Sequence, residues 1–337
     1  MEPLYDFGLE ATRWLQRNYP QLAQLLSIVS ELGRFEFYLA IIPLIYWSIH
    51  KHFGKQVAYL LAVTNAANAI LKHALRMPRP YWLEAEVGLA EESSYGFPSG
   101  HTQVATPFYL YLALEVRKRW MWLLALFIIF LMGVSRVYLG VHFVHGAIAG
   151  VLLGLLLLAG HLIWLRYFAG PFRNRILGQR LLAAIAVPAV AAAIYGGILL
   201  LIGEANQAVA WSTYVEGAER TSLENVTTAV GILLGLGIGF ILEASRIHFL
   251  VDGSLARRGL RYVLGMIVTL AIWRGLGDVF PDDPLWLALP LRLFRYWLAG
   301  MWVAYYAPLV FVRMRLADAS PEPEVQLTIS DESIMKR

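Results

Sequence analysis

The chain has 337 residues, of which 58% are hydrophobic and only 15% are charged, and its mean hydropathy is +0.56. Soluble domains carry roughly 25% charged residues, so this composition excludes an ordinary soluble protein and indicates a polytopic membrane protein. The absence of cysteine excludes disulfides and thiolate chemistry, and a net charge of +4, with its basic residues in short loops, predicts no nucleic-acid partner.

Apolar stretches of about twenty residues, each long enough to cross a bilayer, follow one another along the chain. They predict an all-α fold, a polytopic membrane helical bundle with about nine transmembrane helices, at 35–49, 54–76, 99–116, 119–138, 142–168, 181–202, 223–244, 259–280 and 286–312. The segment 21–33 is expected to be interfacial or re-entrant, because Ser27, Ser30 and Glu31 interrupt it.

Basic residues mark alternate loops, while the intervening loops are acidic or neutral. The positive-inside rule then places the N-terminus outside and the C-terminus inside. We therefore expect a multi-pass integral membrane protein, in the inner or plasma membrane of a bacterium or in the endoplasmic reticulum of a eukaryote. The polar motifs near residues 79, 99, 136 and 142 are expected to face the periplasm, the exterior or the lumen.

The chain has no internal repeat and no long interior linker, which predicts one integral-membrane domain over residues 1–317. Its chemically distinctive motifs lie within 72–142, and added helices follow at about 181–312. Residues 318–337 are polar, acidic and proline-containing, so they are predicted to form a disordered cytosolic tail.

Two positive charges lie at the end of the second predicted span. Lys72 and Arg79 are seven residues apart, almost two helical turns, so they are expected to share one helix face. Pro78 and Pro80 stop the helix and leave Arg79 in an extended segment near the membrane surface. There a planar guanidinium can bind two phosphate oxygens while the lysine adds a point charge. The alternative is that both side chains snorkel to the interface.

The run Pro98-Ser99-Gly100-His101 opens the third predicted span. Ser99 can cap the helix, Gly100 allows close approach of the backbone, and the amides of the first helical turn form a site for an anion. His101 then lies in the first turn and faces the bound group. The alternative is a plain helix cap followed by an interfacial histidine.

Arg136 and His142 flank a tight connection that contains Gly140. A histidine at this position can act as a nucleophile that takes phosphate onto a ring nitrogen, while His101 protonates the leaving oxygen as general acid. Two imidazoles, two arginines and one lysine provide the charge compensation and in-line positioning that phosphoryl transfer requires. The three motifs together predict a phosphate pocket with two histidines.

A metal site is the competing use of His101, His142 and His145. The neighbouring Arg79 and Arg136 repel cations, so no metal and no cofactor are expected. The glutamates of the loops are expected to be solvated surface, and the alternative is that one of them contacts the substrate.

At these residues the chain resembles the type-2 phosphatidic acid phosphatase superfamily, which also contains vanadium haloperoxidases. That superfamily has Lys, six residues, Arg-Pro; then Pro-Ser-Gly-His; then Ser-Arg, five residues, His, three residues, Asp. The stretches that begin at Lys72, Pro98 and Ser135 fit this pattern without a gap. The final Asp does not fit, because position 146 is Gly.

Gly146 narrows the resemblance to the glucose-6-phosphatase catalytic subunit, which also has a second histidine and no Asp at this place. Further similarity lies in Asp6-Phe7-Gly8, Arg79-Pro80-Tyr81-Trp82 and Leu234-Gly235-Leu236-Gly237. In the superfamily the Asp orients the nucleophilic histidine, and no spacing in this sequence brings another carboxylate to His142.

The resemblance implies a phosphatase six-helix-type core in the N-terminal half and metal-independent hydrolysis through a phosphohistidine at His142. It implies that His101 protonates the departing alcohol, while His145 is expected to serve in packing. The phosphate ligands that it implies are Lys72, Arg79, Ser99, Gly100 and Arg136.

These features predict an integral-membrane phosphoric monoester hydrolase that acts on a sugar phosphate and releases inorganic phosphate, with membrane lipids around it. One alternative is a lipid phosphatase that acts on phosphatidic acid, phosphatidylglycerophosphate or a polyprenyl phosphate or diphosphate. Another is a non-catalytic relative that binds or transports phosphate. A lipid needs a lateral opening between spans and a sugar needs a wet mouth, which the polar loop 81–97 favours.

Overall fold

The structure of the protein is a computed structural model that describes residues 2–320. Within that range the chain is helical, apart from connections and one isolated antiparallel bridge between Phe249 and Ala319. The all-α prediction is therefore confirmed. Asp318 to Ser320 pair with the backbone of 248–250, and the remainder of the predicted tail lies outside the described residues.

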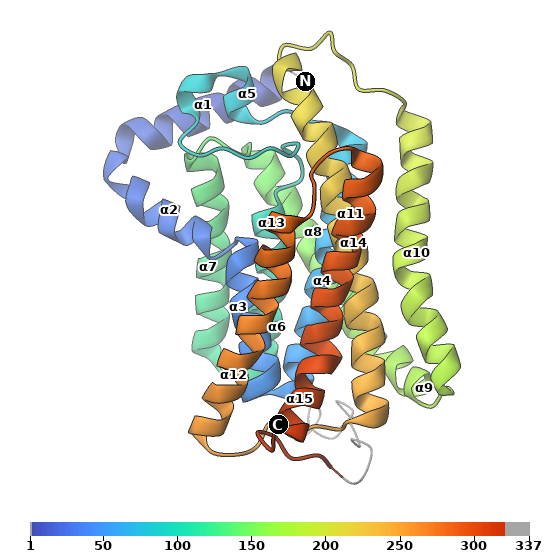
Figure 1. The fold of residues 1–337 in the computed structure, drawn as a ribbon. Coiled ribbons are helices and arrows are strands. Elements are labelled where there is room, and N and C mark those ends of the chain that lie inside the picture. The colour runs from blue at the N-terminus through green and yellow to red at the C-terminus, as the bar shows by residue number, and fades with distance from the viewer. Residues whose placement is uncertain (1, 321–337) are drawn as a thin grey trace. The chain divides into compact units, whose positions relative to one another are not determined.

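Each of the ranges predicted to span the membrane is helical in the structure (Figure 1). The helices that match them are α3 (Phe35–Leu44), α4 (Lys51–Leu75), α6 (Gly100–Val116), α7 (Arg119–Tyr138), α8 (Val144–Ile163), α10 (Leu177–Ile202), α11 (Ser212–Arg246), α12 (Leu255–Leu270) and α14 (Leu285–Met301). The shorter elements are α1 (Glu2–Asn18), η1 (Pro20–Leu22), α2 (Ala23–Glu31), α5 (Pro80–Leu83), η3 (Ala85–Val87), α9 (Ala169–Arg173), α13 (Leu276–Val279) and α15 (Ala307–Arg313). Turns of π-helix extend α3, α8, α12 and α14, at Ile45–Ile49, Trp164–Phe168, Ala271–Gly275 and Trp302–Tyr306.

Five helical runs among residues 2–320 are long and apolar enough to cross a membrane. They are Arg119–Tyr138, Val144–Arg173, Leu177–Ile202, Ser212–Arg246 and Leu255–Val279. The figure of about nine spans therefore stays a prediction for the remaining helices. Helix α6, with 17 residues, is shorter than each of the five runs.

The chain divides into two compact units. Unit 1 comprises Met1–Leu39, Leu61–Leu157 and Ala191–Ala229, and unit 2 comprises Ala40–Leu60, Leu158–Val190 and Val230–Arg337. All three phosphate motifs belong to unit 1. The single domain 1–317 stays a prediction.

Helix α7 is contacted by three other helices of unit 1, α6, α2 and α1 (Figure 1). Its buried positions recur every three or four residues, which is the spacing of one helix face. They include Met121, Ala125, Ile129 and Met132. Leu123 and Phe130, on the other side, are 71% and 66% exposed and are suited to contact with lipid.

Helix α1 fastens the connections around the carboxyl end of α7. Thr12 donates its hydroxyl to the carbonyl of Val137 at 3.1 Å. The Gln16 amide donates to the carbonyls of Val87 and Tyr138 at 2.9 and 2.7 Å. These bonds join the amino-terminal helix to the two loops that carry the phosphate motifs.

Unit 2 has its own buried core, centred on Trp47. The indole N–H of Trp47 donates to the carbonyl of Val303 at 2.9 Å. Lys51 and Glu243, both buried, form an ion pair at 2.8 Å, which offsets part of the cost of burying the two charges.

Candidate active site

The first motif lies where α4 ends and the chain turns into α5. Helix α4 stops at Leu75, and Arg76 takes a left-handed conformation with φ 47°. Arg79 follows as the extended residue before α5, with Pro80 as the first helical residue. The prolines therefore end the helix as expected, but Arg79 does not continue the helical face of Lys72.

Arg79 is completely buried, and four hydrogen bonds fix its guanidinium. Nε and Nη2 donate to the backbone carbonyl and the hydroxyl of Ser94 at 2.6 and 3.0 Å. Nη1 donates to the carbonyl of Val141 at 2.8 Å, and Nη2 donates to the carbonyl of Tyr95 at 3.1 Å. This side chain therefore ties the loop of residues 94–95 to the connection that carries His142.

Lys72 is also buried, and its ammonium donates to the hydroxyl of Ser94 at 2.9 Å. The two cations of the first motif thus share one serine as a partner. Neither side chain snorkels to the surface, because both point into the protein.

The second motif forms the start of α6. Ser99 is the extended residue before the helix, and its hydroxyl accepts from the amide of Thr102 at 3.5 Å. Gly100 is the first helical residue and His101 the second. The Nε2 atom of His101 is buried and has no hydrogen-bond partner within residues 2–320.

The third motif is the turn between α7 and α8. The amides of Val141 and His142 both donate to the carbonyl of Arg136, at 3.3 and 3.2 Å. Gly140 has φ +69°, and a Cβ atom there would overlap the carbonyl of Val87. Glycine is thus required at this turn by both backbone conformation and space.

His142 is completely buried, and both ring nitrogens have a neighbour. Nδ1 lies 2.6 Å from the carbonyl oxygen of Gly96, which can only accept, so Nδ1 carries the proton. Nε2 then holds a lone pair, 3.3 Å from Nη1 of Arg79. Burial, followed by the charges of Arg79 and Lys72, holds the pKa of His142 well below its ordinary value, so the ring is neutral at pH 7.

The superfamily pattern has an Asp at position 146 to orient the histidine, and in this chain the Gly96 carbonyl contacts the His142 ring instead. A Cβ atom at Gly146 would lie 3.5 Å from the Gly96 carbonyl oxygen and 4.0 Å from Nδ1 of His142. A carboxylate at position 146 would therefore compete with that carbonyl for the same ring nitrogen. In this chain a backbone oxygen makes the contact to Nδ1.

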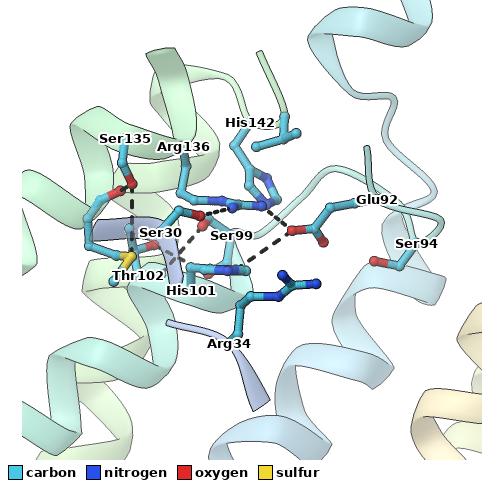
Figure 2. A network of polar contacts seen from close by, with 12 residues as sticks. Ser30, Arg34, Glu92, Ser94, Ser99, His101, Thr102, Ser135, Arg136 and His142 are labelled. Carbon is cyan, nitrogen blue, oxygen red and sulfur yellow. Dashed lines mark hydrogen bonds and ion pairs between the residues drawn. The ribbon is translucent and has the colours of Figure 1, made fainter. Parts of the chain in front are cut away.

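Glu92 lies among the positive charges, which corrects the expectation that the loop glutamates are all solvated surface (Figure 2). Its carboxylate forms an ion pair with Arg136 and lies 3.4 Å from Nη2 of Arg79. Oε1 is 3.9 Å from Nδ1 of His101. Burial raises the pKa of Glu92, but the charges of Arg136 and Arg79 outweigh it and hold the pKa well below its ordinary value.

Ser30 and Ser94 also reach the site, and neither was expected there. Arg136 donates to the Ser30 hydroxyl on α2 (Figure 2). The Ser94 hydroxyl accepts from both cations of the first motif. The sequence pattern that could have indicated Ser30 is its place among the polar residues that interrupt the apolar segment 21–33. Ser94 lies only five residues before the motif residue Ser99, but nothing in its type marked it out.

His145 packs among aromatic rings. Its ring stacks on Phe143 with centroids 5.3 Å apart and lies near Phe97 and Tyr5 at 5.7 and 6.2 Å. This environment agrees with a packing role. The seven residues predicted to form the pocket, by contrast, all belong to unit 1 and line the connections described above.

Comparison with known proteins identifies two regions. The profile "PAP2 superfamily" matches residues 53–169, and "PAP2 superfamily phosphatase, transmembrane extension" matches residues 227–319. Phosphatidylglycerophosphatase B of Bacillus subtilis is 32% identical over 151 residues, which cover 41% of this chain and 72% of that protein.

Glucose-6-phosphatase catalytic subunit 1 of Mus musculus is 28% identical over 188 residues, or 46% of this chain. The match covers 52% of that relative, so this chain spans about half its length. The crystal structure of a PAP2-type phosphatidylglycerolphosphate phosphatase from Bacillus subtilis aligns with a TM-score of 0.42 at 26% identity, covering 49% of this chain and 87% of that one. The matched regions and the identity to the Bacillus relative show that this chain belongs to the PAP2 superfamily.

Proposed function

We propose that this PAP2 superfamily protein is a metal-independent membrane phosphatase that hydrolyses a phosphomonoester through a phosphohistidine at His142. One observation carries the proposal: the ring of His142 is buried and neutral, with Nδ1 bound to a carbonyl and Nε2 beside Arg79. A neutral imidazole held in one tautomer next to cations is suited to attack phosphorus.

In the first step Nε2 of His142 forms a bond to phosphorus, and the phosphorus–oxygen bond of the ester breaks. His101 gives its proton to the departing alkoxide, so the alcohol leaves neutral. The carboxylate of Glu92 lies 3.9 Å from Nδ1 of His101, so a protonated His101 ring would have a negative charge beside it.

In the second step water attacks phosphorus and the phosphorus–nitrogen bond breaks, which returns the neutral His142. His101 takes the proton from the water. Throughout, the phosphoryl oxygens are held by three cations, Lys72, Arg79 and Arg136, and by the amides at the start of α6, which begins at Gly100.

We further propose a sugar phosphate as the substrate, as in the glucose-6-phosphatase resemblance. The polar surroundings of the pocket support it: Glu92, Ser94 and Ser30 offer oxygen atoms that can bind hydroxyl groups. The 188-residue similarity to glucose-6-phosphatase catalytic subunits supports it as well.

A lipid phosphate is the second candidate, and an apolar groove favours it. The groove has a volume of about 850 Å³ and lies in unit 1 between residues of α1, α7 and α8. Phe7, Trp14 and Ile129 line it, as do Val144 and Ala147, close in sequence to His142. An acyl chain fits such a lining, and the Bacillus relative is named for a lipid substrate.

The test is phosphate release by detergent-purified protein from glucose 6-phosphate, phosphatidic acid and a polyprenyl diphosphate. We expect release from the sugar phosphate, none in His142→Ala, and acid-labile phosphate on the wild-type protein during turnover. His145→Phe is the matched control, because it removes an imidazole three residues away and keeps the aromatic packing. Release from lipids alone would select the second candidate, and no release from any substrate would indicate a non-catalytic relative.

A further inference from the structure

A second polar cluster in unit 1 lies next to the phosphate site and has no part in the chemistry above. It is centred on Glu219 of α11, whose carboxylate lies within 3.0 Å of three side chains. Arg76 donates to it twice, at 2.9 and 2.7 Å, and the hydroxyl of Tyr95 donates at 2.6 Å. Nε2 of His73 lies 3.0 Å away, and the other nitrogen of that ring is 2.6 Å from the hydroxyl of Tyr195.

Tyr95 connects this cluster to the phosphate site. Its side chain is 1% exposed, so its hydroxyl depends on the bond to Glu219. Its own carbonyl accepts from Arg79 at 3.1 Å. The next residue, Gly96, supplies the carbonyl that binds Nδ1 of His142 at 2.6 Å. A shift of Tyr95 would therefore move the acceptor that orients the His142 ring.

Glu219 lies outside the parts of the chain that match the superfamily. In the superfamily pattern the carboxylate that orients the histidine lies four residues after it, where this chain has Gly146. Glu219 lies outside residues 53–169, which match the superfamily, and before residues 227–319, which match its transmembrane extension. A carboxylate from an added helix thus binds Tyr95, the residue before the Gly96 carbonyl that contacts His142.

We propose that Glu219 is a positioning residue for His142, acting through the hydroxyl of Tyr95 and the carbonyl of Gly96. This inference rests on the proposed function, because it assigns a role in orienting the proposed nucleophile. The carboxylate suits the role because it accepts from Tyr95 and from cationic Arg76 together. Charge-assisted bonds of this kind are shorter and stronger than neutral ones.

The test compares Tyr95→Phe, Glu219→Gln and the double variant with the wild type. We expect kcat, expressed per active site by titration of bound vanadate, to fall about tenfold in each single variant. KM changes less, because Arg79 keeps its bonds to Ser94 and Val141. The double variant should lose no more than either single variant, because Tyr95→Phe removes the hydroxyl of the same link whose acceptor charge Glu219→Gln removes.

Glu224→Gln is the matched control, since it removes a carboxylate on the same helix that pairs with Arg220 at 3.2 Å. It should keep wild-type kcat. Hydrogen–deuterium exchange of the peptide that covers 94–97 should become faster in Tyr95→Phe and Glu219→Gln and should not change in the control. This second measurement does not depend on turnover.

Unchanged kcat per active site in Glu219→Gln or Tyr95→Phe would overturn the inference, even if less folded protein is recovered. Fully multiplicative losses in the double variant would also overturn it. Failure of the proposed function has a different signature: the wild type itself would release no phosphate, or His142→Ala would remain active. Unchanged exchange at 94–97 would then still overturn the link between Glu219 and this segment.

Discussion

Glu92→Gln should make the site bind inorganic phosphate more tightly. The Glu92 carboxylate pairs with Arg136 and lies 3.4 Å from Arg79, the cations that the proposed mechanism assigns to phosphate. At an effective dielectric constant of about 20, one charge pair at this distance interacts by about 5 kcal/mol before desolvation is counted. A phosphate dianion must therefore either displace this carboxylate or bind beside it.

The size of the effect on phosphate binding follows from the repulsion between the Glu92 carboxylate and a phosphate dianion bound beside it. A unit charge about 8 Å from a dianion, at an effective dielectric constant of about 40, costs about 2 kcal/mol. Removing that charge should lower the inhibition constant of inorganic phosphate about 30-fold at pH 7. The measurement is competitive inhibition of phosphate release, with vanadate as a second competitor. Glu91→Gln is the control, because it removes an exposed charge from the same loop.

The same variant should be less stable without ligand. A neutral amide in place of the carboxylate leaves Arg136 and Arg79 buried beside an uncharged group, which should lower the free energy of unfolding by about 1–3 kcal/mol. Because the pKa of Glu92 is depressed, its contribution is present above the ordinary carboxyl pKa and is lost as the pH falls through the lower folded value. Saturating phosphate should stabilise the variant more than the wild type. An unchanged or higher inhibition constant would refute this reasoning, since Glu92 would then not oppose phosphate.

Gly146→Ala should keep activity within about threefold, because the added Cβ makes only ordinary contacts of 3.5 to 4.0 Å. Gly146→Asp should lower kcat, because its carboxylate competes with the Gly96 carbonyl for Nδ1 of His142. Equal kcat in the two variants would contradict this. Arg79→Lys should reduce kcat/KM by about 100-fold or more, because a single ammonium cannot make the four hydrogen bonds of the guanidinium. Steady-state kinetics checks this, and a loss below tenfold would argue against a fixed guanidinium. Because burial and nearby cations depress the pKa of His142, its neutral form persists as the pH falls through about 6.5, so phosphoenzyme formation, corrected for substrate ionisation, should show no acid limb at that pH. Single-turnover rates between pH 5 and 8 check this, and such a limb would show that the ring titrates normally.

The sequence was sufficient to predict the three motifs and their meeting in one site, because each is marked by residues with narrow structural uses. Pro80 begins α5, Ser99 caps α6, and Gly140 makes a turn that no other residue fits. These local rules fix where Lys72 and His142 stand relative to helix ends. The helical ranges followed in the same way from apolar runs of membrane length.

The remaining parts of the site depend on contacts that leave no pattern in the sequence. Glu92 looks like any loop glutamate, and only the folded loop brings it to Arg136. The Gly96 carbonyl is a backbone group, so no residue type announces it. Glu219 lies in a different helix from every motif, and helix packing alone brings it to Tyr95.

The charge balance of the pocket explains why a phosphatase would keep a carboxylate there. In the proposed mechanism Lys72, Arg79 and Arg136 supply three formal positive charges and Glu92 one negative charge, which leaves two to match a phosphomonoester dianion. Without Glu92 the pocket would hold both substrate and phosphate more tightly, and uniform tightening does not accelerate the chemical step. It would instead slow the departure of phosphate, the product that must leave before the next turnover. Glu92→Gln should therefore lower kcat while it tightens phosphate binding, and the two changes together separate a carboxylate that tunes product release from one that serves only to stabilise the fold.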